Sequence, residues 1–86
     1  MKLEKRNYYF TKILECLLEN QLVTTKDIAE KTKISEKTTR TKISEINEYL
    51  LDNALGEIQK KPRIGNWLEV DDKQRSKIKQ IIYNYL

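Results

Sequence analysis

Two helix starts stand eleven residues apart in the segment that decides the fold. Residues 24–50 read TTKDIAEKTKISEKTTRTKISEINEYL. Thr24 precedes Asp27 by three places, and Ser35 stands directly before a long run with helical spacing. Threonine and serine are favoured at helix starts because their hydroxyl oxygens accept hydrogen bonds from free backbone N–H groups. The segment therefore predicts a short helix at 25–32, a tight turn and a longer helix at 36–52, which is the outline of a helix-turn-helix.

The longer predicted helix has two chemically different faces. At 3.6 residues per turn, its inner face holds Thr39, Ile43, Ile46 and Leu50. Its outer face holds Lys37, Thr41, Ser44 and Glu48, with Arg40 at the flank. Basic and hydroxylic side chains in the first turns of such a helix are placed to reach base edges in the major groove. An ordinary amphipathic helix with a solvated face explains the same pattern, so the interpretation depends on the flanking segments.

The composition favours one small domain and argues against several classes of function. The 86 residues carry 17 Lys and Arg against 13 Asp and Glu, and the net charge of +4 permits a polyanionic partner without requiring one. The single cysteine, Cys16, excludes an internal disulfide, fits a reducing cytoplasm and is expected to be inert. We expect no metal or cofactor, because the chain has no histidine and no phosphate-binding or nucleophile motif. We also expect no enzymatic activity, secretory signal or membrane span.

Apolar spacing predicts two further helices. Phe10, Ile13, Leu14, Leu17 and Leu18 recur at helical intervals and place a first helix at about 7–20. After a cap at Asp71 or Asp72, a last helix at about 72–85 carries a second stripe, formed by Ile78, Ile81, Ile82 and Tyr85. This stripe should be buried, either against the first helix or in a second copy of the chain.

Residues 55–70 have the composition of a β-hairpin. Two short apolar runs flank a segment that contains Pro62 and Gly65, and these residues predict a turn. The pair Leu22 and Val23 is expected to add a short strand. Three cations stand at the predicted tip: Lys60, Lys61 and Arg63. A basic hairpin after a helix-turn-helix is the outline of a wing that meets phosphates or the minor groove, although a solvated basic turn has the same composition.

These segments together resemble a known group of bacterial regulators. Residues 22–31 and 34–40 are similar to the N-terminal winged helix-turn-helix of BglG-like activators with phosphotransferase regulation domains, and of the related Mga-type virulence regulators. The match continues through Ile43, Glu45, Ile46, Asn47, Glu48, Leu50, Lys61, Pro62, Gly65 and Leu68, and it covers about residues 10–70. The resemblance implies a DNA-binding module at the front of a dimeric cytoplasmic transcription regulator, whose later domains sense phosphorylation or metabolites.

Three positions depart from the family pattern. Arg63 stands where these wings often have glycine, so the turn type should differ. Asn66 stands where an aromatic residue is usual, which leaves open whether the following Trp67 points inward or outward. Thr39 replaces a larger apolar residue, and we expect a less filled contact between the second and third helices.

Two other readings stay open. A similar module begins bifunctional biotin protein ligases, although the helix predicted after Val70 argues against that reading. A winged helix can also serve only for protein contacts, but an apolar outer face would then be expected where this chain has Lys37, Arg40, Thr41 and Ser44.

The sequence thus predicts a mainly α fold with a small β-hairpin, a winged helix-turn-helix with a three-helix core, a wing and an extra C-terminal helix. Residues 1–86 are expected to form one DNA-binding domain at the N-terminal part of a longer regulator, with its core at 7–70. The predicted buried residues are Phe10, Ile13, Leu14, Leu17, Val23, Ile28, Ile34, Ile43, Ile46, Leu50, Ile58 and Leu68.

The predicted function is sequence-specific binding of double-stranded DNA, with a homodimer formed through the last helix or through downstream domains. The recognition helix at 36–52 and its cap supply seven candidate DNA-binding residues: Ser35, Glu36, Lys37, Thr38, Arg40, Thr41 and Ser44. The wing supplies Lys60, Lys61 and Arg63, and the first helix of the motif supplies Thr25 and Lys26.

Overall fold

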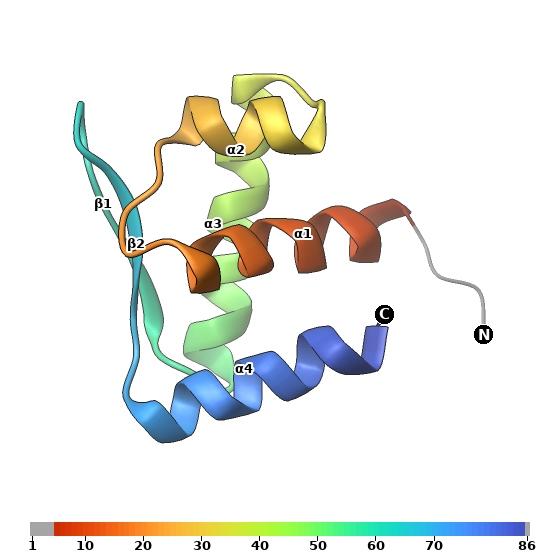
Figure 1. Ribbon diagram of the computed structural model, residues 1–86, viewed down its shortest axis with the longest axis vertical. Helices are drawn as coiled ribbons and strands as arrows, with labels where there is room; N and C mark the ends of the chain where they lie inside the picture. The colour runs from red at the N-terminus through yellow and green to blue at the C-terminus, as the bar shows by residue number, and fades with distance from the viewer. Residues whose placement is uncertain (1–4, 86) are drawn as a thin grey trace.

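Four helices and one β-hairpin make up the part of the chain that the computed structural model describes, which is residues 5–85, with side chains for residues 8–84. The elements follow one another as α1 Lys5–Glu19, α2 Thr25–Thr32, α3 Glu36–Asp52, β1 Glu57–Lys61, β2 Gly65–Glu69 and α4 Asp72–Tyr85 (Figure 1). The predicted winged helix-turn-helix with an extra C-terminal helix is confirmed. The first helix begins two residues earlier than predicted, and α2, α3 and α4 have the predicted bounds.

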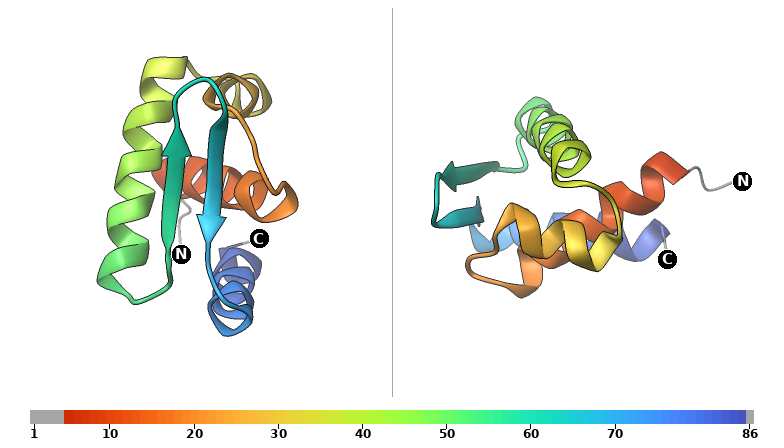
Figure 2. Two further views of the ribbon diagram at one scale, coloured as in Figure 1. Left: turned by 90° about the vertical axis from the view of Figure 1, so that its left-hand side faces the viewer. Right: turned by 90° about the horizontal axis from the view of Figure 1, so that it is seen from above.

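The elements surround one apolar centre. In Figure 1, α1 crosses in front of α3, α4 lies below α1, and the hairpin closes the side opposite the first turn of α1 and the last turn of α4. Contacts join α1 to α2, α3, β2 and α4, so α1 is the helix on which the others pack. The hairpin lies beside α3 and extends towards the end where α2 is placed (Figure 2). This arrangement brings the N-terminal turns of α2 and α3 to the same end of the molecule as the hairpin tip.

Local hydrogen bonds explain the helix-turn-helix boundaries. The Thr24 hydroxyl accepts a hydrogen bond from the Asp27 N–H at 3.0 Å, and the Ser35 hydroxyl accepts one from the Thr38 N–H at 3.0 Å. Between them Lys33 adopts the left-handed conformation at φ 61°, and the Ile34 N–H donates to the Ala29 carbonyl at 3.2 Å. Both caps and the turn thus satisfy backbone groups that a helix end otherwise leaves free.

The buried side chains of all elements form one cluster. Its members are Ile13, Leu14, Cys16, Leu17, Val23, Ile28, Ile43, Ile46, Leu50, Leu55, Ile58, Leu68, Ile78 and Ile82. Burying a leucine or isoleucine side chain contributes about 1.5–3 kcal/mol, so this cluster is the main source of stability. Thr39 is also fully buried, and its hydroxyl donates to the Ser35 carbonyl at 2.8 Å.

The prediction of full burial was wrong for two residues of the predicted core. Phe10 is only half-buried, because its ring lies at the rim of the core and meets the Tyr49 ring edge-on with centroids 5.1 Å apart. Ile34 is also half-buried, because it lies in the turn between α2 and α3 rather than inside a packed element. Cys16 and Leu55 are buried core residues that the predicted core did not include.

The last helix packs on the first helix, which is one of the two placements predicted for it. Ile78 and Ile82 are buried, and α1 and α4 are in contact. The Arg75 guanidinium donates to the Leu18 carbonyl at 3.3 Å. The α4 start is a reciprocal cap, in which the Gln74 N–H donates to the Asp71 carboxylate at 2.7 Å and the Gln74 side chain accepts from the Asp71 N–H. The predicted contact of the Tyr85 side chain lies outside the described side chains.

The hairpin has the predicted turn and an additional partner. β1 and β2 pair antiparallel, with Ile58 opposite Leu68 and Lys60 opposite Asn66. The turn between them closes with the Ile64 N–H donating to the Lys61 carbonyl at 3.0 Å, and Arg63 adopts φ 70°. Val23 forms an isolated antiparallel bridge with Asn66, so the expected pairing with the hairpin is present, but as one bridge rather than the short strand predicted for Leu22 and Val23.

Alternation along β2 answers the question of Trp67. Asn66 and Leu68 are buried, whereas Trp67 between them is half-buried. Successive side chains of a strand point to opposite faces, so Asn66 faces the interior and Trp67 the other face of the hairpin.

Candidate nucleic-acid interface

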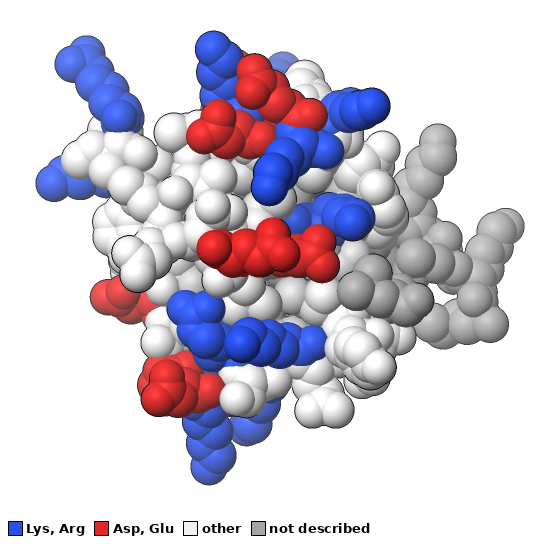
Figure 3. Space-filling view, in the orientation of Figure 1, with Lys and Arg blue, Asp and Glu red and all other residues white. Residues whose placement is uncertain are grey.

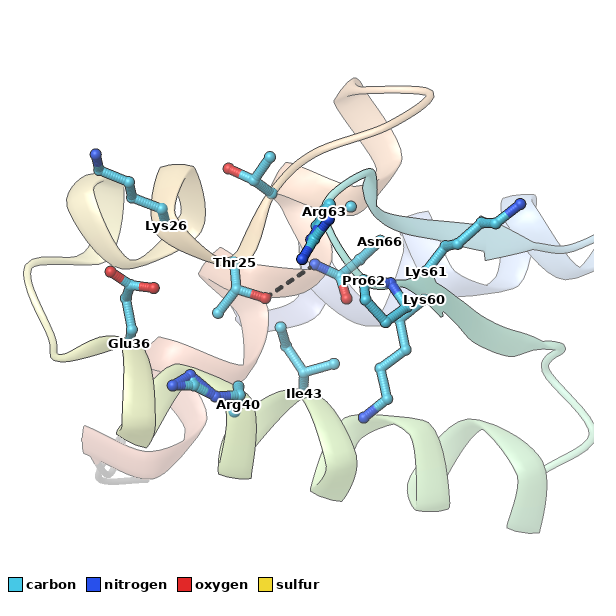
Figure 4. A pocket seen from close by; sticks show the side chains of 12 residues that line it. Thr25, Lys26, Glu36, Arg40, Ile43, Lys60, Lys61, Pro62, Arg63 and Asn66 are labelled. Carbon is cyan, nitrogen blue, oxygen red and sulfur yellow. Dashed lines mark hydrogen bonds between the residues drawn. The ribbon is translucent and has the colours of Figure 1, made fainter.

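A groove of about 570 Å³ opens between α2, α3 and the hairpin. Three separate segments line it: Thr24, Thr25 and Lys26; Glu36, Arg40 and Ile43; and Lys60, Lys61, Pro62, Arg63, Gly65 and Asn66. Figure 4 shows Lys60 extending from the hairpin towards α3, and Arg63 turned back towards the N-terminus of α2. The fold therefore brings the predicted wing cations and Arg40 of the recognition helix to one site.

The groove is strongly basic. Its lining contains the cations Lys26, Arg40, Lys60, Lys61 and Arg63, and one carboxylate, Glu36. Within the described part of the chain, none of these charged side chains forms an ion pair, and all are exposed. Among the described residues on the face drawn in Figure 3, basic side chains project over the end of the hairpin without an acidic neighbour. A cluster of cations with so few acidic neighbours creates a positive potential that attracts a phosphate backbone.

The other candidate residues of α3 lie outside this groove. Lys37, Thr38, Thr41 and Ser44 are exposed on the helix but do not line the groove. The Ser35 hydroxyl accepts from the Thr38 N–H and donates to the Thr38 hydroxyl at 2.9 Å, so its first role is to cap the helix. The Thr41 hydroxyl donates to the Lys37 carbonyl at 3.3 Å. The candidate residues thus lie in two places, on an open face of α3 and in the groove beside it. Arg40 lies at the boundary between the two.

Sequence reasoning missed five residues of the groove as site residues: Thr24, Ile43, Pro62, Gly65 and Asn66. Thr24 was predicted only as a cap and Ile43 only as a core residue, and both roles are confirmed as well. Asn66 carried a signal, because a polar residue stood where this strand was expected to hold an aromatic one. Its side chain is 3% exposed and donates to the Thr25 hydroxyl at 3.2 Å, which joins the hairpin to α2 (Figure 4).

The described residues offer little for other chemistry. No three histidine, cysteine, aspartate or glutamate side chains among them are grouped to hold a metal ion. Burial raises the pKa of the Cys16 thiol above its usual value, against the opposing effect of Lys31. A buried thiol with a raised pKa is mostly protonated and therefore a poor nucleophile. No helix in the described range has the length and apolar character needed to cross a membrane.

Comparison with protein families assigns this fold. The Mga helix-turn-helix domain matches residues 3–64, which is more than half of the chain and includes the helix-turn-helix, β1 and the hairpin turn. Comparisons with curated proteins and with solved structures find no match. The match confirms the resemblance to Mga-type regulators, whose helix-turn-helix domain is a DNA-binding rather than an enzymatic unit. The chain therefore belongs to the Mga helix-turn-helix domain family and has the DNA-binding fold of a transcription regulator.

Proposed function

We propose that this chain binds double-stranded DNA sequence-specifically, with α3 in the major groove and the hairpin on the adjacent backbone or minor groove. The observation that carries the proposal is the groove lined by cations of α2, α3 and the hairpin, none of which forms an ion pair among the described residues. An α-helix with its side chains is about 10–12 Å across, which fits a major groove about 12 Å wide. With α3 in the major groove, the hairpin meets the neighbouring backbone.

The two parts of the surface have different roles in this proposal. Lys37 and Arg40 reach base edges, where basic side chains favour the O6 and N7 acceptors of guanine. Thr38, Thr41 and Ser44 add less selective hydroxyl contacts, and Glu36 is placed to accept from cytosine N4. Phosphate contacts come from Lys60, Lys61 and Arg63 in the hairpin, and from Thr25, Lys26 and the backbone N–H groups beside Ser35 at the helix starts.

Selection from a pool of random duplexes tests the proposal. Purified chain is incubated with the pool, the retained duplexes are sequenced after several rounds, and affinities are measured for an enriched and a scrambled duplex. We expect an enriched motif, with affinity for it about 10³-fold or more above that for scrambled DNA at physiological salt. Equal affinities for both duplexes would remove sequence specificity, and no salt-dependent binding to either would remove DNA binding altogether.

We further propose that residues 1–86 form the N-terminal DNA-binding domain of a dimeric cytoplasmic regulator. A twofold dimer would place two α3 helices on half-sites about 34 Å apart, as in other helix-turn-helix dimers. Ile78 and Ile82 are buried within the chain, so they are not available for a contact with a second copy. Sedimentation of the chain at tens of micromolar separates the two sources of dimerisation. If the chain sediments as a monomer, residues 1–86 do not form the dimer contact by themselves. If it sediments as a dimer, the contact lies within residues 1–86.

A further inference from the structure

Asn66 is a buried polar residue at the junction of the hairpin and α2. Its side chain is 3% exposed, and its Nδ2 donates to the Val23 carbonyl at 3.1 Å and to the Thr25 hydroxyl at 3.2 Å. Its backbone N–H donates to the Val23 carbonyl at 2.8 Å, and its carbonyl accepts from the Val23 N–H at 3.0 Å. One residue therefore makes four hydrogen bonds to the segment that enters α2.

The backbone beside Asn66 is shaped for this junction. A side chain at Gly65 would place its Cβ 3.0 Å from the Val23 carbonyl oxygen, and Gly65 adopts φ +138°. Only glycine combines this conformation with so close an approach at low cost. The close contact between the hairpin and residue 23 thus depends on Gly65, and Asn66 adds the side-chain bond to the first residue of α2.

This junction is part of the wall of the basic groove, because Thr25 and Asn66 both line it. Asn66 pairs across the hairpin with Lys60, and the Lys60 side chain extends into the groove towards α3 (Figure 4). Thr25, the acceptor of the Asn66 bond, lines the same groove at the N-terminus of α2. At the other end of the hairpin, the Ile58 N–H donates to the Asn47 side chain of α3 at 2.7 Å. The two bonds hold the hairpin from both sides, and the Asn66 bond is the one next to the cations.

We propose that Asn66 is a positioning residue that holds the hairpin against α2, so that Lys60 and the recognition helix contact one DNA molecule at the same time. The proposal rests on the DNA binding proposed above and adds the residue that connects its two surfaces. Asn66 itself does not touch DNA, because its side chain is buried and its two amide hydrogens are directed to Val23 and Thr25. When the side-chain bonds are removed, only the two backbone bonds to Val23 hold this part of the hairpin to the segment that enters α2, and we expect the hairpin tip to move more easily away from the DNA that α3 holds.

The salt dependence of DNA binding separates this role from a purely structural one. Log K falls as log salt rises, and each phosphate contact contributes about 0.9 to the steepness of this slope, whatever the stability of the folded protein. In the wild-type background, Lys60→Ala should make the slope less steep by about one unit. In the Asn66→Ala background the same substitution should reduce the steepness by less than about half a unit, because the Lys60 side chain no longer contacts the phosphate backbone of the DNA. Circular dichroism at the binding temperature confirms that each variant is folded.

Two further variants complete the experiment. Thr25→Val removes the acceptor of the Asn66 bond and keeps the side-chain shape, so it replaces Asn66→Ala should that variant not fold. Asn53→Ala truncates another asparagine, whose Nδ2 donates to the Tyr49 carbonyl at 2.8 Å at the end of α3, outside the groove. In the Asn53→Ala background the Lys60 effect should stay at about one unit.

The outcomes separate this inference from the proposed function. If Lys60→Ala reduces the salt dependence equally in the wild-type and Asn66→Ala backgrounds, Asn66 has no positioning role. If Asn66→Ala is unfolded, the same comparison is made between the wild-type and Thr25→Val backgrounds, and an equal effect leads to the same conclusion. In that case the proposed DNA binding stands, because the wild-type chain still shows a salt-dependent affinity. If the wild-type chain does not bind duplex DNA, the proposed function fails and this inference fails with it.

Discussion

Leu50→Ala is expected to lower the free energy of unfolding by about 2–5 kcal/mol. Leu50 is 0% exposed at the C-terminal end of α3 and belongs to the central apolar cluster. The substitution removes buried methyl groups and leaves a cavity that the surrounding helices fill only in part. A chain of this length has a total stability of roughly 4–13 kcal/mol, so the variant should lose a large fraction of it. Urea unfolding followed by circular dichroism measures the difference.

The neighbouring residue supplies a matched control. Leu51 has the same side chain on the same helix but is 53% exposed. Leu51→Ala should therefore change the free energy of unfolding by no more than about 0.5 kcal/mol. Trp67 fluorescence provides a second probe, and coincident transitions would support a single cooperative unit. Equal destabilisation by the two substitutions would show that the described placement of α3 is wrong.

Arg40→Ala is expected to weaken binding to the selected duplex by about 1–3 kcal/mol, and binding to scrambled DNA much less. Arg40 is exposed where the open face of α3 meets the basic groove, and it forms no ion pair with any described residue. A guanidinium at that position can donate two hydrogen bonds to one guanine, and a wrong base cannot accept both. Competition binding with the selected and scrambled duplexes measures the two losses. Equal losses on both would make Arg40 a phosphate contact.

Lys61 gives the contrasting variant, because it lies on the hairpin and is assigned to phosphate. Lys61→Ala should weaken binding to both duplexes by a similar factor. It should also make the slope of log K against log salt less steep by about one unit. A loss confined to the selected duplex would instead place Lys61 on a base edge. The two variants together test the division of the surface into a helix that reads bases and a hairpin that binds the backbone.

The helix-turn-helix was predictable because its signals are local. The Thr24 and Ser35 caps each bond to a backbone N–H three residues away, so the sequence contains both partners within one turn. The hairpin was predictable for a similar reason, since Pro62 and Gly65 mark its turn and the cations follow one another. These features depend on backbone chemistry that neighbouring residues decide.

The groove and the edge of the core were harder to predict because distant residues create them. Asn66 donates hydrogen bonds to Val23 and Thr25, which stand 43 and 41 positions away. No pattern among neighbouring residues predicts contacts between residues so far apart in the sequence. Arg40 was placed at the flank of its helix, but only the position of the hairpin makes that flank a wall of the groove. Ile34 has an apolar side chain in a turn, and its half-burial depends on how α2 and α3 pack.

Amide chemical shifts, measured while the ¹⁵N-labelled chain is titrated with the selected duplex, test the central claim most directly. Our account predicts that the largest changes fall in three segments that meet at one end of the molecule: residues 36–44 of α3, 60–65 of the hairpin, and 25–26 of α2. Amides of α4, which packs on the far side of α1, should change little. Changes concentrated on α1 and α4, with none in α3 or the hairpin, would contradict the assignment of the groove and the open face of α3 as the DNA-binding surface.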